Sequence, residues 1–220
     1  MIIAIDGPAG SGKSTTAKKV ATRLNLMHLD TGAMYRAVAL YILSKDIAES
    51  YLTNHTLMTQ LLDEIEIKFS NDTNNVFLNG KDVSIEIREN SVSEFVSEVS
   101  AISLVRERMV LLQREIAAGN NVVLEGRDIG TRVFPNADLK IYLNANINER
   151  GQRRFKELVG RGEKTTLEAV IQNIELRDLK DSSREHSPLE KAKDAIEIDT
   201  TKLSIDAQVN EIVSLIQTNN

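Results

Sequence analysis

Residues 1–14 read MIIAIDGPAGSGKS. The apolar run at 2–5 leads into Gly7–Ser14, which matches the pattern G-x-x-x-x-G-K-[ST] throughout. Glycines in such a loop let consecutive backbone N–H groups turn inward onto phosphate oxygens, the lysine adds a positive charge, and the serine hydroxyl can bind Mg²⁺. The run at 15–24 has helical character, and a helix N-terminus also favours anions. These residues therefore predict a strand, a phosphate-binding loop (P-loop) and a helix, in that order.

The composition excludes several classes of protein. The chain has 220 residues, 27% of them charged, and a net charge of −5, whereas proteins that bind nucleic acid generally carry a basic excess. There is no cysteine, so disulfide and thiolate chemistry are excluded, and we expect a reducing, cytoplasmic location. We expect no signal peptide, and no apolar run reaches the length of about 18 residues that spans a bilayer.

Strand-like and helix-like segments alternate along the chain, which favours a parallel α/β sheet covered by helices. The expected strands are short and apolar: 2–6, 27–30, 121–125, 139–144 and 195–199. The expected helices lie between and after them: 13–24, 32–44, 104–118, 146–158, 166–180 and 204–217. Hydroxyl side chains predict the starts of three of these helices. Ser103 is expected to cap the helix at 104–118, and Ser204 the last helix. Thr165 and Glu168 would form a capping box at the start of 166–180.

One region departs from this alternation. Residues 65–69 alternate apolar and polar side chains, and 76–78 are separated from 81–83 by Asn79-Gly80. Asn-Gly between such runs is a strong signal for a two-residue hairpin turn. The region 63–85 is therefore predicted to form a small antiparallel meander.

Five arginines lie near the ends of predicted elements: Arg36, Arg106, Arg127, Arg177 and Arg184. Asp30 and Arg127-Asp128 directly follow predicted strands, and ligands of open parallel sheets bind at those strand ends. Guanidinium groups bind phosphate through paired N–H donors. The pattern favours a second, phosphorylated substrate and phosphoryl transfer, which needs cations around the transferred group.

Residues 149–164, ERGQRRFKELVGRGEK, contain six basic residues and end near Gly-Arg-Gly. This pattern predicts a mobile basic flap that closes over a triphosphate and excludes water. A solvated helix face is the alternative interpretation for several of these basic residues.

Four segments together resemble bacterial cytidylate kinases, a family of nucleoside monophosphate kinases: GPAGSGKS (7–14), DTGAMYR (30–36), EGRDIGTRVFPNADLKIYL (125–143) and RDLKDSSREHSPL (177–189). The resemblance runs from Ile3 to the last predicted helix. It implies a single kinase domain with a P-loop NTPase-type parallel sheet. Within that domain it implies a core at 1–62, 96–148 and 165–220, a monophosphate-binding insertion at 63–95 and a short helical lid at 149–164.

The same resemblance implies a role for each matching residue. ATP would contact Gly7, Pro8, Ala9, Gly10, Ser11, Gly12, Lys13, Ser14 and Thr15, with Ser14 on Mg²⁺. The acceptor CMP would contact Thr31, Tyr35, Arg36, Ser97, Arg106, Arg127, Asp128, Arg177, Asp181 and Arg184. Lys13, Arg127 and Asp128 would be catalytic, and the lid would contribute Arg150, Arg153, Arg154 and Arg161.

The implied reaction transfers the γ-phosphoryl group of ATP, with Mg²⁺, to CMP or dCMP. Asp128 and Asp30 are both possible further partners of the metal. We expect a monomer that binds neither nucleic acid nor membranes. Two alternatives are another small-substrate P-loop kinase, for shikimate, gluconate or thymidylate, and a nucleotide-dependent switch. A switch would need a guanine-reading N-K-x-D element, which the sequence lacks.

Overall fold

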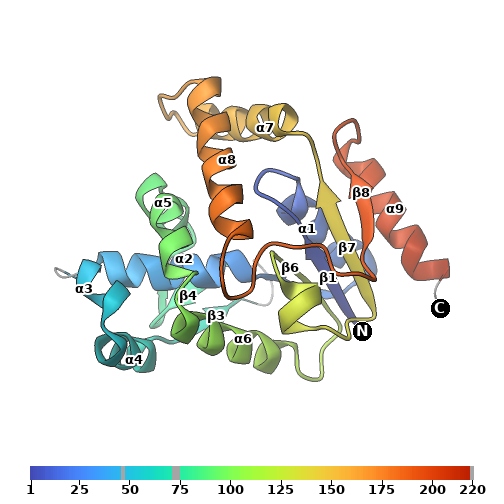
Figure 1. The fold of residues 1–220 in the computed structure, drawn as a ribbon. Coiled ribbons are helices and arrows are strands. Elements are labelled where there is room, and N and C mark those ends of the chain that lie inside the picture. Colours follow the sequence, from blue (N-terminus) through green and yellow to red (C-terminus); the bar gives the residue numbers. More distant parts are fainter. Residues whose placement is uncertain (46–47, 71–74, 219–220) are drawn as a thin grey trace. The chain divides into compact units, whose positions relative to one another are not determined.

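A parallel sheet carries the P-loop at the end of its middle strand (Figure 1). In the computed structural model, which describes residues 1–45, 48–70 and 75–218, β1 (Ile2–Asp6) pairs in parallel with β6 (Val122–Gly126) and β7 (Leu139–Asn144). The strand order is β2-β6-β1-β7-β8, with β2 at Met27–Asp30 and β8 at Ile196–Asp199. All five predicted strands are confirmed to within one residue. Their apolar side chains suit strands that are covered on both faces.

The chain divides into two compact units. Unit 1 consists of Met1–His28 and Gly119–Asn220, and unit 2 consists of Leu29–Ala118. The helices of unit 1 are α1 (Lys13–Leu24), α7 (Ile147–Gly160), α8 (Leu167–Ser182), α9 (Ile205–Thr218) and a π-helical turn, η2 (Ile129–Val133).

The core of unit 1 lies between the sheet and two helices. Ile3 of β1, Val20 of α1 and Ile212 of α9 belong to one cluster and are fully buried. Burying each such side chain stabilises the fold by about 1.5–3 kcal/mol. A second cluster, which includes Leu158 and Ile174, joins α7 to α8. The packing of α1 against the sheet holds the start of that helix, and with it the P-loop, in place.

Unit 2 is mostly helical and contains a small antiparallel sheet. Its elements are α2 (Thr31–Leu43), α3 (Ala48–Thr53), α4 (His55–Glu64), β3 (Ile67–Phe69), β4 (Val76–Leu78), β5 (Lys81–Asp82), η1 (Glu86–Arg88), α5 (Asn90–Val99) and α6 (Ser103–Ala117). The sequence pattern predicted α2 and α6 but not α3 or α4.

The predicted meander is confirmed. The strands pair in the order β3-β4-β5, with Ile67 opposite Leu78 and Phe77 opposite Asp82. Asn79 and Gly80 form the hairpin turn with φ angles of 49° and 79°. Two positive φ angles match the right-handed twist of the flanking strands, which is why Asn-Gly is favoured there. Residues 71–74 of the predicted region lie outside the described residues.

The predicted helix starts have mixed outcomes. The cap at Ser204 is confirmed, since its Oγ accepts a hydrogen bond from the N–H of Ala207 at 3.2 Å. The cap at Thr165 is wrong by one residue, because Thr166 accepts from Ala169 instead. The cap at Ser103 is also wrong, because the helix already includes Ser103. Thr165 and Thr166 are equally good caps by residue type, so the local sequence does not decide which of them caps the helix.

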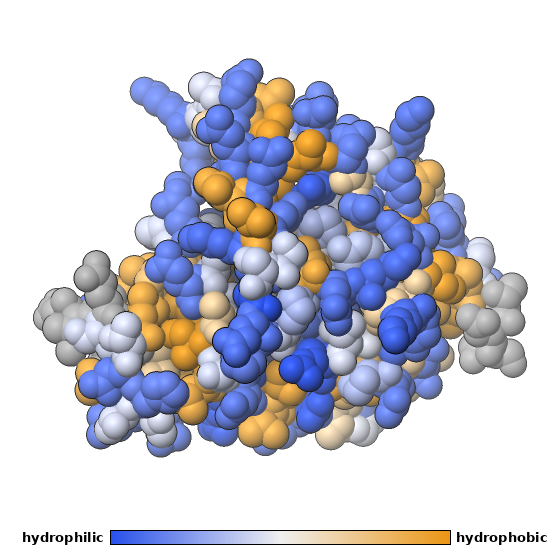
Figure 2. All heavy atoms as spheres, viewed as in Figure 1, coloured by the Kyte–Doolittle hydropathy of each residue, from blue (hydrophilic) through white to orange (hydrophobic). Residues whose placement is uncertain are grey.

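Polar residues cover most of the face seen in Figure 2, with apolar side chains exposed along α8. Leu176 and Leu179 of that helix are 61% and 63% exposed. Within the described ranges, no helix is both long and apolar enough to cross a membrane.

Candidate active site

The backbone path of the P-loop requires a glycine at its first position. Gly7 has a φ of 147°, and a Cβ atom there would lie 2.0 Å from the carbonyl oxygen of Leu143 on β7. Any side chain at this position would collide with a neighbouring strand. Gly12 has a φ of 94° and forms the N-cap of α1, so the loop passes directly into the helix. The backbone N–H groups at that helix start are therefore available to an anion.

Lys13 is buried inside the loop, with 5% of its surface exposed. Its Nζ donates to the carbonyl oxygen of Pro8 at 2.6 Å and lies 3.4 Å from Oγ of Ser11. Burial and the nearby positive charge of Arg127 lower the pKa of Lys13 well below its ordinary value. A polyphosphate in the loop would favour the charged form of this lysine, because opposite charges at short range stabilise each other.

Ser14 is hydrogen-bonded to a carboxylate to which the sequence analysis assigned no role. Its Oγ donates to Oε2 of Glu125 at 2.5 Å. Glu125 is 3% exposed and stands near the end of β6, opposite Ile5 of the P-loop strand. An acidic residue ending the apolar run VVLEG next to the P-loop strand was the signal that could have identified it.

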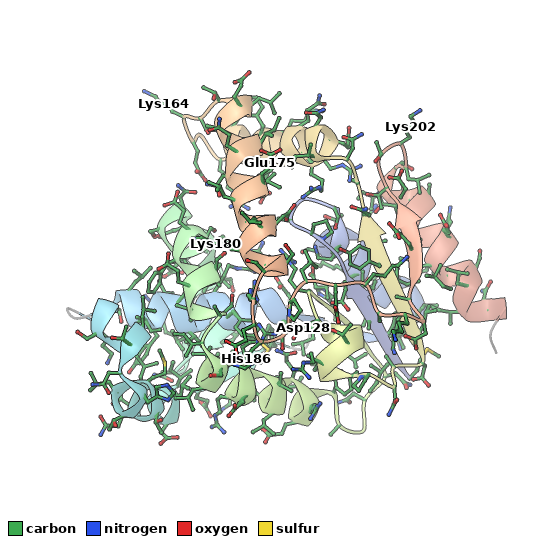
Figure 3. All side chains as sticks on the ribbon, in the orientation of Figure 1. Asp128, Lys164, Glu175, Lys180, His186 and Lys202 are labelled. Carbon is green, nitrogen blue, oxygen red and sulfur yellow. The ribbon has the colours of Figure 1, made fainter. Side chains whose placement is uncertain are left out.

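The turn that follows β6 is held by a buried carboxylate. Asp6, 5% exposed, accepts hydrogen bonds from the N–H groups of Ile129 at 2.9 Å and Gly130 at 2.8 Å. Burial raises the pKa of Asp6 to about 6, against the lowering effect of these two bonds. These bonds position Asp128, which directly precedes the turn, is 4% exposed and is labelled in Figure 3.

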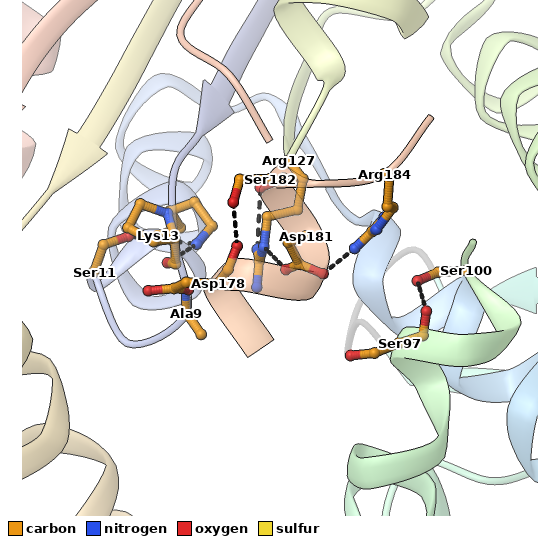
Figure 4. Close-up of polar contacts among 12 residues, drawn as sticks. Ala9, Ser11, Lys13, Ser97, Ser100, Arg127, Asp178, Asp181, Ser182 and Arg184 are labelled. Atoms are coloured by element: carbon orange, nitrogen blue, oxygen red, sulfur yellow. Dashed lines mark hydrogen bonds and ion pairs between the residues drawn. The ribbon is translucent and has the colours of Figure 1, made fainter. Parts of the chain in front are cut away.

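A second buried carboxylate holds two of the predicted arginines (Figure 4). Asp181, 2% exposed, accepts from Nε of Arg127 at 3.0 Å and is also paired with Arg184. Burial alone would raise the pKa of Asp181, but the charges of Arg127, Arg184 and Arg177 outweigh it and lower that pKa below its ordinary value. The structure thus brings together four of the residues predicted to bind the acceptor.

The predicted lid arginines fall into two groups. Arg150 and Arg153 reach the P-loop backbone, Arg150 donating to Ala9 O at 3.0 Å and Arg153 to Ser11 O at 3.5 Å. Arg150 also pairs with Asp178 at 2.5 Å. The other two, Arg154 of α7 and Arg161 directly after it, both pair with Glu157 of α7. Lys164, at the end of the basic segment, points into solvent in Figure 3.

In unit 2, the N-terminus of α2 is built around Asp30. Its Oδ1 accepts from the N–H of Ala33 at 3.0 Å, which caps the helix, and its Oδ2 accepts from Arg36 at 2.9 Å. Thr31 follows directly and is 3% exposed. Asp30 was one of two possible metal partners, but its carboxylate is engaged as a helix cap and as the partner of Arg36.

The remaining predicted residues of unit 2 lie around a buried arginine. Arg106 is 4% exposed, and its guanidinium carbon lies 5.3 Å from the centre of the Tyr35 ring. Its Nη1 donates to the carbonyl oxygen of Ser100 at 3.1 Å. Ser97, 8% exposed, lies one helical turn before Ser100, and its carbonyl oxygen accepts a hydrogen bond from Oγ of Ser100. The guanidinium is thereby held by a ring on one element and a carbonyl on another.

A family model of cytidylate kinase matches residues 3–218. The chain belongs to the cytidylate kinase family. It is 49% identical to the cytidylate kinase of Leuconostoc mesenteroides over 219 residues, covering 99% of this chain and 96% of that protein. It is also 49% identical to the cytidylate kinase of Clostridioides difficile over 216 residues, covering 98% of each.

A solved structure of an uncharacterized protein from Eubacterium ventriosum shares the fold. Its TM-score is 0.53 at 14% identity, with 99% of each chain covered. This likeness shows the fold alone.

Membership of the cytidylate kinase family confirms the resemblance found in the sequence, and with it the expected fold class and an enzyme of the kinase type. It decides against the two alternatives, a kinase for a different small acceptor and a nucleotide-dependent switch. Among the described residues, no group of three or more His, Asp or Glu side chains could hold a metal ion. Kinases generally hold Mg²⁺ through one or two protein oxygens together with substrate phosphates.

Proposed function

We propose that this cytidylate kinase family member transfers the γ-phosphoryl group of ATP to CMP or dCMP, giving ADP and CDP or dCDP. The observation that carries the proposal is the buried Lys13 inside a glycine loop at the start of α1, in a chain whose whole length matches the family. A buried cation surrounded by inward-facing backbone donors suits the phosphates of a nucleoside triphosphate.

On the donor side, we assign the ATP phosphates to the loop from Gly7 to Thr15. Lys13 neutralises charge on the transferred group, where it accumulates in the transition state. Arg150 and Arg153 hold the loop through its carbonyl oxygens, so we assign them to shaping it. Arg154 and Arg161 can exchange the exposed Glu157 for phosphate, so they are the lid arginines that we assign to the closing step.

The residues around Ser14 fit a magnesium ion. Ser14 donates its own proton to Glu125, which leaves the hydroxyl lone pairs available to a hard cation. We therefore assign the metal to Ser14, with Glu125 as the carboxylate beside it in place of Asp30 or Asp128. When bound, Mg²⁺ would neutralise charge on the triphosphate.

On the acceptor side, the phosphate of CMP is already an anion, so no strong general base is required. Catalysis then depends on positioning and on charge neutralisation. We assign the acceptor phosphate to Thr31, Tyr35, Arg36 and Arg127, with Arg184 on phosphate or base, and the ribose to Arg177 and Asp181. Arg36 and Arg127 are each held in place by a carboxylate, which reduces the entropy lost when phosphate binds.

The assignment of the base rests on the family resemblance. Cytosine has acceptors at O2 and N3 and a donor at N4, so Arg106 can donate to the acceptors, while Ser97 and Asp128 can accept from the amino group. Uracil has an acceptor at O4, which a carboxylate would repel. We expect Asp128→Ala to erode the preference for CMP over UMP, and an unchanged ratio would remove Asp128 from base recognition.

The test measures ADP release from ATP and Mg²⁺ with CMP, dCMP, UMP and AMP offered separately. We expect rapid release with the two cytosine nucleotides and little with the others. Release with none of the four would overturn the proposal. Lys13→Ala should lower turnover by several orders of magnitude while the protein stays folded, and near-normal turnover would show that the loop was misassigned.

We also propose that the enzyme acts as a monomer in the cytoplasm, which its lack of cysteine suits. Light scattering on the purified protein, with and without nucleotides, tests the monomer, and a dimeric mass would contradict it.

A further inference from the structure

His28 is a buried titratable side chain to which the sequence analysis assigned no role. It lies on β2, beside β6 in the sheet, and its side chain is 9% exposed. Its Nε2 lies 3.2 Å from Oε1 of Glu125. The other oxygen of that carboxylate, Oε2, accepts from Ser14. The two oxygens of Glu125 thus have different partners, one from β2 and one from the P-loop.

The chemistry of the carboxylate fixes the direction of this contact. An ionised carboxylate can only accept hydrogen bonds, so the short contact requires a proton on Nε2 of His28. No residue that the structure describes forms a hydrogen bond with the buried Nδ1 of His28. A proton on Nε2 alone leaves Nδ1 as an acceptor without a partner, whereas a proton on Nδ1 alone would leave a buried donor without a partner and Nε2 without the proton that the contact with Glu125 requires. The ring is therefore used for one purpose, to donate to Glu125.

We propose that His28 is a positioning residue for the metal site: it fixes the Glu125 carboxylate so that Oε2 faces Ser14 and the Ser14 hydroxyl presents its lone pairs to Mg²⁺. This inference rests on the proposed function, in which Ser14 and Glu125 flank the ion. A glutamate side chain has three rotatable bonds, so its orientation depends on the partners of its carboxylate. Ser14 engages Oε2, and the bond from the His28 ring on a neighbouring strand restrains Oε1.

A purely structural histidine would fill space and stabilise β2 without affecting the metal. The two roles differ in what they predict for nucleotide binding. A space-filling residue affects metal-free and metal-bound nucleotide alike, whereas a positioning residue affects only the gain in affinity that Mg²⁺ provides. Loss of a hydrogen-bonding partner around a metal ligand typically costs about 10–100-fold in metal affinity.

The test measures the affinity of the intact protein for a β,γ-imido analogue of ATP by calorimetry, with Mg²⁺ and with EDTA. For His28→Phe, which keeps a planar ring but loses the donor, we expect the Mg²⁺-dependent gain to fall about tenfold, with metal-free affinity changed by less than about twofold. His28→Gln, whose amide can donate to Glu125, should restore most of that gain. His55→Phe, at an exposed histidine on α4, should behave like the unmodified protein.

A double-mutant cycle separates action through Glu125 from a direct effect. In a Glu125→Ala background, His28→Phe should cause no further loss of the Mg²⁺-dependent gain. An unchanged gain in His28→Phe, or an equal loss with and without Glu125, would overturn the inference. If His28→Phe fails to fold, the same comparison between His28→Gln and His28→Ala decides it, since only the former can donate.

Failure of the proposed function has a separate signature. In that case the unmodified protein itself would show no Mg²⁺-dependent gain for the ATP analogue. A normal gain in the unmodified protein, with no change in the variant, would overturn only the role of His28.

Discussion

Asp6 and Asp181 are both buried carboxylates of unit 1, yet their pKa values move in opposite directions. Asp6 contacts two backbone N–H groups, and burial raises its pKa to about 6. Asp181 contacts two guanidinium groups, whose charges outweigh burial and lower its pKa. Backbone dipoles offset part of the desolvation cost of a carboxylate, whereas full positive charges reverse it. Burial alone therefore does not indicate whether a carboxylate is charged at neutral pH.

The two carboxylates also serve different purposes. Asp181 holds Arg127 and Arg184 in place through ion pairs, and its charge raises the pKa of Arg127 although burial lowers it. Asp6 organises the backbone of the turn that follows Asp128 by accepting hydrogen bonds from two of its N–H groups. Asp181 therefore positions side chains, and Asp6 positions a loop.

The largest effect is expected from Asp181→Ala. This change removes the buried carboxylate that pairs with Arg127 and Arg184, whose side chains are 20% and 8% exposed, and breaking a largely buried ion pair costs about 3 kcal/mol or more. Urea unfolding at pH 7 measures the loss, and Asp206→Asn, which breaks an exposed pair with Lys19, provides a control expected to change nothing measurable. A loss no larger than that of the control would show that the arginines find other partners.

A second prediction concerns pH. Because the pKa of Asp6 in the folded protein, about 6, exceeds its ordinary value of 3.8, the folded state binds more protons than the unfolded state between these values. The contribution of Asp6 to stability is therefore greatest below pH 4 and falls by about 3 kcal/mol as the pH rises through 6, since one pKa unit corresponds to about 1.4 kcal/mol. The lowered pKa of Asp181 gives the opposite slope, with stability lost as the pH falls below 3.8.

The measurement compares Asp6→Asn with the unmodified protein by urea unfolding at pH 4.5 and pH 7. The variant has no titrating group at position 6, so its stability relative to the unmodified protein should improve between these two pH values. Asp63→Asn, at an exposed carboxylate, controls for the general effect of removing a charge. A constant difference between the two proteins at both pH values would contradict a raised pKa for Asp6.

Asp30 in unit 2 combines both kinds of contact, a backbone N–H and an arginine, at 17% side-chain exposure. Asp30→Ala should cost about 1 kcal/mol, the usual value of a helix N-cap, and should also weaken CMP binding by releasing Arg36. Asp30→Asn keeps a capping oxygen and should retain most of the stability while raising the KM for CMP. If both variants lost the same stability, the ion pair would matter more than the cap.

These contacts explain what the sequence could predict and what it could not. The strand ends and the turn at Asn79-Gly80 were predictable because apolar runs and positive φ angles are local properties. The helices α3 and α4 were missed, although α4 has a start signal in Asn54, whose side chain accepts a hydrogen bond from the N–H of Leu57 and caps the helix. Glu125 and His28 received no role because their importance depends on which strands are neighbours, and the order β2-β6-β1 is a tertiary property. Likewise, the composition of 149–164 identified a basic segment, but only the three-dimensional contacts separate Arg150 and Arg153, which donate to P-loop carbonyl oxygens, from Arg154 and Arg161, which pair with Glu157.

The smallest effect is expected at Glu157, which provides the sharpest contrast with Asp181. Each carboxylate pairs with two arginines, but the side chain of Glu157 is 43% exposed and that of Asp181 is 2% exposed. Solvent screens exposed pairs, so Glu157→Gln should change the free energy of unfolding by less than about 0.5 kcal/mol, although it removes the same number of ion pairs as Asp181→Ala. Urea unfolding of both variants under one condition measures the contrast. Equal losses would mean that the number of pairs, and not their burial, sets the energy of these contacts.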